Sequence, residues 1–173
     1  MSIPNVYTLG SMCLLTGRKT TLYKEMRRKD RQLDKIQAES ILEKAQFGYL
    51  ATSFPDGAPY VVPVNHIYLD GYIVFHCARE GQKLDNLRAN PSVCYAVTTH
   101  NRLMPEKTTT EYQSAVAFGT AEIVTEPALK KALLTGLMTR LAPGVPFSCD
   151  DAGIERTAVV RIKVDRLTGK SND

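Results

Sequence analysis

The sequence predicts a mainly β protein in which short antiparallel strands close into a small barrel flanked by helices. Runs rich in β-branched and aromatic residues are separated by turn residues that tolerate positive φ, such as Pro55-Asp56-Gly57 and Asp70-Gly71. Segments with helical periodicity precede, interrupt and follow these runs. Short strands leave exposed edges, and closure into a barrel hides them, which favours this fold class.

Each element has its own local pattern. Apolar residues on one face predict a first helix over Asp34–Ala45, and a short helix over Gln82–Arg88 ends where Asn90-Pro91 excludes helical geometry. Glu126–Leu141, with Pro127 just inside its start, predicts the last helix. Thr99–Glu111 is polar, and we expect a loop there that borders a pocket. The predicted strands are Phe47–Phe54, Tyr60–Tyr68, Tyr72–Cys77, Val93–Thr98, Tyr112–Val124 and Ala158–Leu167.

Length and composition indicate one globular domain. The chain has 173 residues, of which 43% are hydrophobic and 23% charged, ordinary values for a soluble protein. Residues 1–24 lack a clear period and predict an irregular N-terminal arm, so the domain is expected over residues 25–173. No signal peptide and no apolar run long enough to span a bilayer is evident, and we expect a cytoplasmic protein without membrane contact.

The net charge of +4 is concentrated in residues 18–31, where seven basic and two acidic side chains give a local charge of +5. No nucleic-acid-binding motif accompanies this segment, so we interpret it as a solvated approach to the first helix and expect no nucleic-acid partner. The four cysteines are widely spaced and form no CxxC pair, which favours reduced thiols. Cys77 is open to two interpretations, a reactive thiol or a small core residue.

Two features of the central segment suit a phosphorylated ring compound. Ala78–Lys83 follows a strand, contains Gly81 and places Lys83 in the first turn of a helix. This arrangement has two interpretations, a phosphate-binding segment or an ordinary turn with a solvated lysine. Pro63 cannot donate to a sheet ladder and predicts an edge strand or bulge with free backbone groups. Those groups can pair with a flavin ring or simply face solvent.

His66 and His76 lie on neighbouring predicted strands. Two histidines without a convergent carboxylate or cysteine are poor evidence for a metal site, so none is predicted. His76 is the better placed of the two for acid–base or binding chemistry, because it immediately precedes the candidate phosphate loop.

Taken together, GYLATSFPDGAPYVVPVNHIYLDGYIVFHCAREGQKLDNLRANPSV from Gly48 onward resembles the pyridoxamine 5′-phosphate oxidase-like, FMN-binding split-barrel superfamily. Within it, the segment is most similar to the branch of the nitroimidazole-resistance (Nim) proteins. The similarity runs from about Met26 to Lys170 and includes YQSAVAFGTAEIV and VRIKVDRLTGK. The resemblance implies a six-stranded antiparallel split β-barrel, a homodimer and FMN sites at the subunit interface.

The resemblance also implies roles for individual residues. The strand that lines the flavin ring corresponds to Val62, Pro63, Val64 and Asn65. The residues around the phosphate and ribityl chain correspond to His76, Gln82 and Lys83. The strand that approaches the cofactor, from the other subunit, corresponds to Tyr112, Gln113 and Ser114. His76 also matches a histidine that sits beside the bound substrate.

Departures from the family pattern limit the function. Gln82 replaces an arginine, the arginine expected near Val62 is missing, the chain has no Trp, and it ends soon after Gly169. Oxidation of vitamin B6 is therefore disfavoured. The resemblance implies an FMN-dependent oxidoreductase with a small-molecule substrate, of which a nitroaromatic such as a 5-nitroimidazole is one option. The alternatives are a non-catalytic flavin binder and a haem binder with His66 or His76 as axial ligand.

Overall fold

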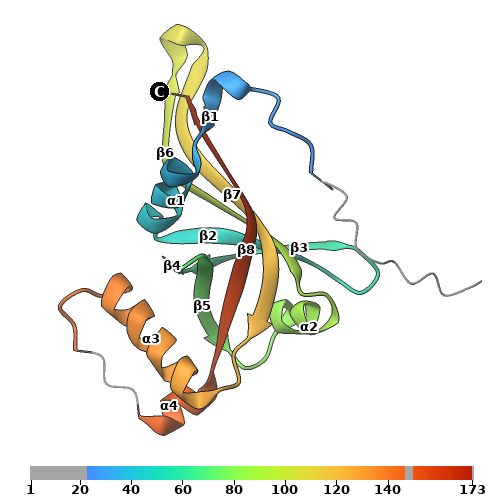
Figure 1. The fold of residues 1–173 in the computed structure, drawn as a ribbon, viewed down its shortest axis with the longest axis vertical. Helices are drawn as coiled ribbons and strands as arrows, with labels where there is room; N and C mark the ends of the chain where they lie inside the picture. Colours follow the sequence, from blue (N-terminus) through green and yellow to red (C-terminus); the bar gives the residue numbers. More distant parts are fainter. Residues whose placement is uncertain (1–22, 147–149, 173) are drawn as a thin grey trace, which may run out of the picture.

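One strongly curved antiparallel sheet forms the centre of the molecule, and helices pack around it (Figure 1). The computed structural model describes residues 23–146 and 150–172. The sheet orders its strands β3-β2-β6-β7-β8-β5-β4, and β1 pairs with β8. Its long strands are β2 (Phe47–Ser53), β3 (Pro59–Asn65), β5 (Tyr72–Ala78), β6 (Ser92–Met104), β7 (Thr109–Ile123) and β8 (Thr157–Asn172); β1 (Gln32–Leu33) and β4 (Ile67–Leu69) are short.

The helices are α1 (Lys35–Lys44), α2 (Gln82–Ala89), α3 (Pro127–Leu141) and α4 (Asp151–Arg156), with short 3-10 turns η1 (Lys29–Arg31) and η2 (Pro105–Lys107). Local chemistry explains the helix starts. Asp34 and Gln37 form a reciprocal capping box at α1, and the Glu126 carboxylate accepts hydrogen bonds from the Ala128 and Leu129 amides at α3. Within the described residues, no helix combines the length and apolar character needed to cross a membrane.

The sheet closes on itself incompletely. The hydrogen-bonded path ends at β3 on one side and at β4 on the other, while β3 lies against β5 without pairing to it. This is the predicted split barrel, and its six long strands correspond to the six predicted ones. The opening between β3 and β5 leaves β3 as an edge strand.

The barrel interior holds the larger of two apolar cores. Tyr95 is fully buried, and its hydroxyl donates to the Val64 carbonyl oxygen at 3.2 Å. A Cβ at Gly48 would collide with the Tyr95 ring, so only glycine fits at this point of β2. Other members of this core are Leu42, Leu50, Ile73, Phe75, Leu84, Val97, Val160 and Ile162.

The second core lies between the sheet and α3, and it contains Ile67, Val74, Leu134, Leu137 and Val159. Because successive residues of a strand face opposite sides, Val74 enters this core while Ile73 and Phe75 enter the barrel. The middle of β5 is therefore buried on both faces.

Several sequence predictions need correction. Thr99–Glu111 is not a loop, because β6 continues to Met104, β7 begins at Thr109, and only η2 turns the chain between them. Ladder pairing from Asn101↔Tyr112 to Met104↔Thr109 holds this hairpin together although most of its side chains are polar or exposed, which is why its composition resembles a loop. The sequence also gave no indication of β1 and α4. The predicted N-terminal arm lies outside the described residues, except for Tyr23 and Lys24.

Candidate functional site

The edge strand β3 carries four of the predicted site residues. Val62 and Val64 point inward and pack against the barrel core, whereas Pro63 and Asn65 are exposed. Pro63 pairs with Tyr49 of β2, and no strand within the described residues pairs with its other side. The Asn65 side-chain amide donates to the Gln46 carbonyl oxygen at 3.0 Å, which fixes the end of the strand.

Immediately after β3, His66 is a buried structural residue. Only 1% of its surface is exposed, and its Nε2 donates to the Leu42 carbonyl oxygen at 3.0 Å. Its Nδ1 is buried without a hydrogen-bond partner among the described residues. Burial lowers the pKa of His66, so the ring is neutral at neutral pH. A ring held in this way is not available as an axial haem ligand.

His76, in contrast, is exposed on β5, opposite Val159 of β8. The adjacent Cys77 points the other way, is half-buried and packs against the barrel core. Burial raises the pKa of the Cys77 thiol, while the charge of Lys83 acts in the opposite direction. The interpretation of Cys77 as a core residue is therefore favoured over a reactive thiol.

The start of α2 is an uncapped helix N-terminus. Gly81 precedes it with φ 130°, a conformation that favours glycine, and no side chain in the described part of the chain accepts a hydrogen bond from the first-turn amides. Apart from Gly81 and its chain neighbours, no atom of residues 23–146 or 150–172 lies within 4 Å of the position that a Cβ on Gly81 would occupy. Lys83 is half-buried in this first turn.

Gln82 starts a chain of side-chain hydrogen bonds that the sequence analysis missed. Its amide donates to Asn86 Oδ1 at 2.7 Å, and the Asn86 amide donates to Thr52 Oγ1 of β2 at 3.0 Å. Asn86 and Thr52 are both buried. A buried polar residue on a helix face that also carries Leu84 and Leu87 is not recognisable from sequence, because Asn suits an exposed helix position equally well.

Tyr112, Gln113 and Ser114 lie on β7, away from the other predicted residues. Ser114 pairs with Thr98 and Lys170. His76 lies opposite Val159, and the Val159 carbonyl oxygen accepts a hydrogen bond from the Val124 amide at 2.9 Å, so His76 lies near the Val124 end of β7. Ser114 and Val124 are separated by roughly 30 Å of strand, at about 3.3 Å per residue. β3 contacts β5 and α2 contacts β2, whereas β2 and β6 lie between β3 and β7 in the sheet. One chain therefore brings together β3, His76, Gln82 and Lys83, but not the β7 residues.

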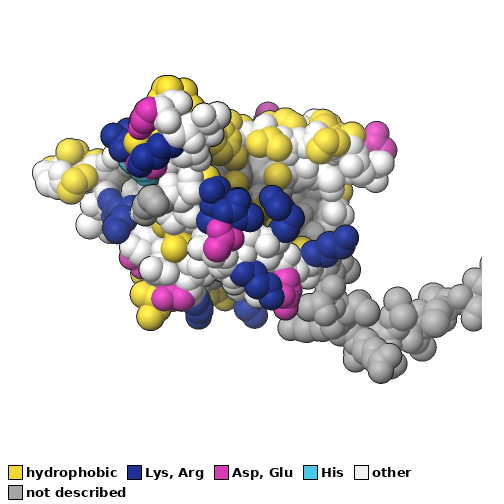
Figure 2. Space-filling model, turned by 90° about the horizontal axis from the view of Figure 1, so that it is seen from above, with side chains coloured by type: hydrophobic (Ala, Val, Ile, Leu, Met, Phe, Trp, Pro, Cys, Tyr) yellow, Lys and Arg dark blue, Asp and Glu magenta, His cyan; other side chains and the backbone are white. Residues whose placement is uncertain are grey.

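The surroundings of Tyr112 are positively charged. The Lys170 ammonium lies 5.3 Å from the centre of its ring. Partial burial acts to raise the pKa of Tyr112, but hydrogen bonds and charge from Lys170 and Arg31 outweigh it and lower the pKa. Arg28 and Arg31 also line a small cleft of about 420 Å³ nearby. Seen from this end of the molecule, Lys and Arg side chains gather over the middle of the surface (Figure 2).

Known proteins resemble the chain in sequence and in fold. A family model described as pyridoxamine 5′-phosphate oxidase matches residues 34–171. A solved structure from Bacteroides thetaiotaomicron, a candidate 5-nitroimidazole antibiotic resistance protein, is 27% identical with a TM-score of 0.73, over 80% of this chain and 85% of that one. No significant match was found among curated proteins.

Two further structures share the fold at lower identity. A flavocytochrome from Azotobacter vinelandii is 19% identical with a TM-score of 0.76, over 86% of this chain and 72% of that one. A FAD- and heme-binding protein from Mycobacterium smegmatis is 19% identical with a TM-score of 0.73, over 83% of this chain and 74% of that one.

Proposed function

The chain belongs to the pyridoxamine 5′-phosphate oxidase family, and from this premise we propose that it binds FMN and acts as a flavin-dependent oxidoreductase. One observation carries the proposal: the open edge of β3, the exposed His76 and the uncapped start of α2 lie on neighbouring elements. These features match the ring, the substrate side and the phosphate of one flavin nucleotide. The solved structures named for flavin or flavocytochrome content support the choice of cofactor class.

The phosphate would lie at the start of α2. A helix N-terminus favours an anion, because its first amides point outward and the helix dipole is positive there. Lys83 adds a positive charge in the same turn, and Gly81 leaves the approach open. Gln82 stands where the resemblance has arginine, and its amide is engaged with Asn86, so Lys83 carries the charge compensation.

The ring would lie along β3. Proline has no N–H, so Pro63 fits a ladder position at which backbone groups point away from β2. Since these positions alternate, we expect the backbone groups of Val61, Pro63 and Asn65 to face the open edge. A flavin ring edge carries both donors and acceptors and would hydrogen-bond there.

FMN supplies electron transfer when bound, and the protein supplies position and a proton. His76 is exposed beside this edge and is placed to orient a substrate or to donate a proton to it. We propose a nitroaromatic substrate, such as a 5-nitroimidazole, on the basis of the 27% identity to the Bacteroides thetaiotaomicron protein.

A homodimer would complete the site. Tyr112, Gln113 and Ser114 cannot reach the flavin held by their own β3 and α2, but the same residues of a second copy can. The outer face of β2 and β3 exposes Phe47, Tyr49 and Val61, with exposed fractions of 49%, 46% and 58%. Exposed apolar surface next to the candidate site favours association there.

Titration with FMN, followed by the flavin absorbance and fluorescence, tests the cofactor. We expect Lys83→Ala to weaken FMN binding by about 10- to 100-fold, because it removes a charge-assisted bond to the phosphate. Lys163→Ala, at an exposed position of β8, is the matched control and should bind like the wild type. Failure to bind FMN, or equal weakening in both variants, would contradict the proposal.

Single-turnover oxidation tests the chemistry without knowledge of the natural electron donor. Protein-bound FMN is photoreduced without oxygen, with EDTA as the electron donor, and mixed with a 5-nitroimidazole, and the return of flavin absorbance is followed. We expect His76→Ala to slow this step while FMN binding is retained. An unchanged rate in His76→Ala would remove His76 from the reaction, and no reoxidation at all would favour a non-catalytic flavin carrier. Isolation of the protein with haem in place of flavin would overturn the cofactor assignment.

A further inference from the structure

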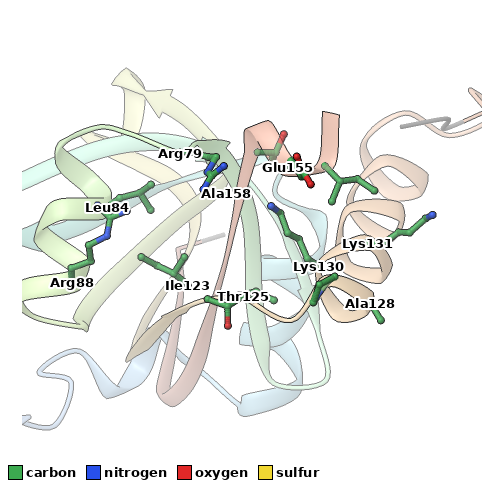
Figure 3. Close-up of a pocket in the computed structure, with 14 residues that line it drawn as sticks. Arg79, Leu84, Arg88, Ile123, Thr125, Ala128, Lys130, Lys131, Glu155 and Ala158 are labelled. Carbon is green, nitrogen blue, oxygen red and sulfur yellow. The ribbon is translucent and has the colours of Figure 1, made fainter. Parts of the chain in front are cut away.

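A cleft of about 980 Å³ lies between α2, the end of β7, the start of α3 and the junction of α4 with β8 (Figure 3). None of the ten residues predicted to bind flavin lines it. Its size falls in the range of small-molecule sites. The cleft adjoins the proposed flavin site, because Arg79 belongs to the Ala78–Lys83 segment, but the residues assigned to the flavin lie outside its lining.

The rim of the cleft is strongly basic. Arg79, Arg88, Lys130 and Lys131 line it, and among the described residues Glu155 is the single carboxylate in the lining. Arg88 forms an exposed ion pair with Asp85, but in the described part of the chain the side chains of Arg79 and Lys130 make no ion pair or hydrogen bond. Lys130 points into the cleft towards Arg79, whereas Lys131 points away (Figure 3).

The floor of the cleft is apolar and firmly held. Leu84, Val124, Ile154 and Ala158 line it and are buried, and they belong to the two cores of the molecule. Ile123 completes the floor between them. A flat apolar group could rest here without displacing a core side chain.

We propose that this cleft binds an organic phosphate with an apolar, ring-sized body. The ring rests on the floor, and the phosphate lies between Arg79 and Lys130. Two unpaired cations suit a dianionic phosphate better than a monocarboxylate, and a guanidinium matches the phosphate oxygens with two parallel bonds. The N-terminus of α3 contributes no anion site, because Glu126 already accepts from its first amides.

Calorimetric titration with phenyl phosphate tests this proposal, both without FMN and with FMN at saturation. We expect saturable binding in both conditions, with Kd raised at least about fivefold in Arg79→Gln and in Lys130→Gln. Glu155→Gln removes the carboxylate that the described residues contribute to the rim and should tighten binding by about two- to fivefold. Lys163→Gln removes an equal charge elsewhere and should change Kd less than twofold.

The remaining outcomes overturn the proposal. The first is that no saturable binding is found, and the second is that Lys163→Gln weakens binding as much as Arg79→Gln and Lys130→Gln do. The third is that binding disappears with FMN at saturation or in Lys83→Ala, since phenyl phosphate would then occupy the flavin site. The measurement without FMN keeps the test decisive even if the protein binds no flavin. Circular dichroism and thermal melting confirm that each variant is folded, and the tighter binding of Glu155→Gln cannot arise from misfolding.

Discussion

Two histidines that look equivalent in the sequence have opposite surroundings in the fold. His66 is buried between β3 and β4 and bonded to the Leu42 carbonyl oxygen, whereas His76 is exposed. A protonated His66 would place a second N–H donor at Nδ1, where no acceptor lies among the described residues. The neutral ring is therefore part of the folded state, and His66 serves stability, whereas the exposed His76 is the histidine to which we assign the proposed chemistry.

Stability should consequently fall in mild acid. Burial lowers the pKa of His66 below its ordinary value of 6.5, so the unfolded chain binds a proton at a higher pH than the folded one. This contribution is fully present above pH 6.5 and is lost as the pH falls towards the folded pKa. Urea unfolding between pH 5 and 8 should show the decline in the wild type and in His76→Gln, but a flatter profile in His66→Gln. If the free energy of unfolding of His66→Gln depended on pH as it does in the wild type, groups other than His66 would cause the decline.

At the scale of the element, the placement of α2 depends on polar contacts as well as on apolar ones. Leu84 and Leu87 enter the barrel core, and between them Asn86 joins Gln82 to Thr52 of β2. This chain orients the first turn of α2 against the strand that pairs with β3. The same contacts would set the position of Lys83 relative to a bound phosphate.

Asn86→Ala should lower the free energy of unfolding by about 2 kcal/mol, because Gln82 and the buried Thr52 hydroxyl both lose their partner. FMN binding should weaken as well, since the first turn of α2 is no longer held. Asp85→Ala, one residue earlier, loses only an exposed ion pair with Arg88 and should cost less than about 1 kcal/mol. Urea unfolding and FMN titration of both variants provide the comparison, and equal effects would show that the polar chain is unimportant.

At the scale of the whole molecule, the split barrel separates the residues that the family resemblance groups together. β6 and β7 form a long hairpin that extends beyond β2 and carries Tyr112 to Ser114 towards the end of the molecule with η1 (Figure 1). The outer face of the barrel presents Phe47 and Tyr49 in contact with each other, beside Pro63 and Ala96 across the strands. Both features are consistent with the homodimer that we propose.

Tyr49→Asp should therefore convert a dimer into monomers, because a carboxylate would be buried in an apolar interface. The monomer should also bind FMN more weakly, since the β7 residues of a second copy are absent. Ile36→Asp, at a 77% exposed apolar position on α1, is the control and should remain dimeric. Sedimentation equilibrium decides the result: a wild-type monomer, or a dimeric Tyr49→Asp, would remove this face from the interface.

The sequence by itself determined the order and type of the main elements. Turn residues such as Asp70-Gly71 and caps such as Asp34 act within a few residues of chain, so their effect is visible in a linear pattern. It also determined the family, through the order of its motifs. The hairpin within Thr99–Glu111 was not predicted, because it is held by backbone hydrogen bonds, which form regardless of side-chain polarity.

Only the tertiary structure decided which side chains share a place. Three features depend on residues that are far apart in the chain. They are the burial of His66, the hydrogen bonds that link Gln82 to Thr52, and the basic cleft with Arg79 and Lys130. Strand periodicity tells which residues share one face, but not which other element covers that face. The separation of Tyr112 from His76 likewise depends on strand register and sheet curvature, which are set by packing between elements rather than by any local pattern.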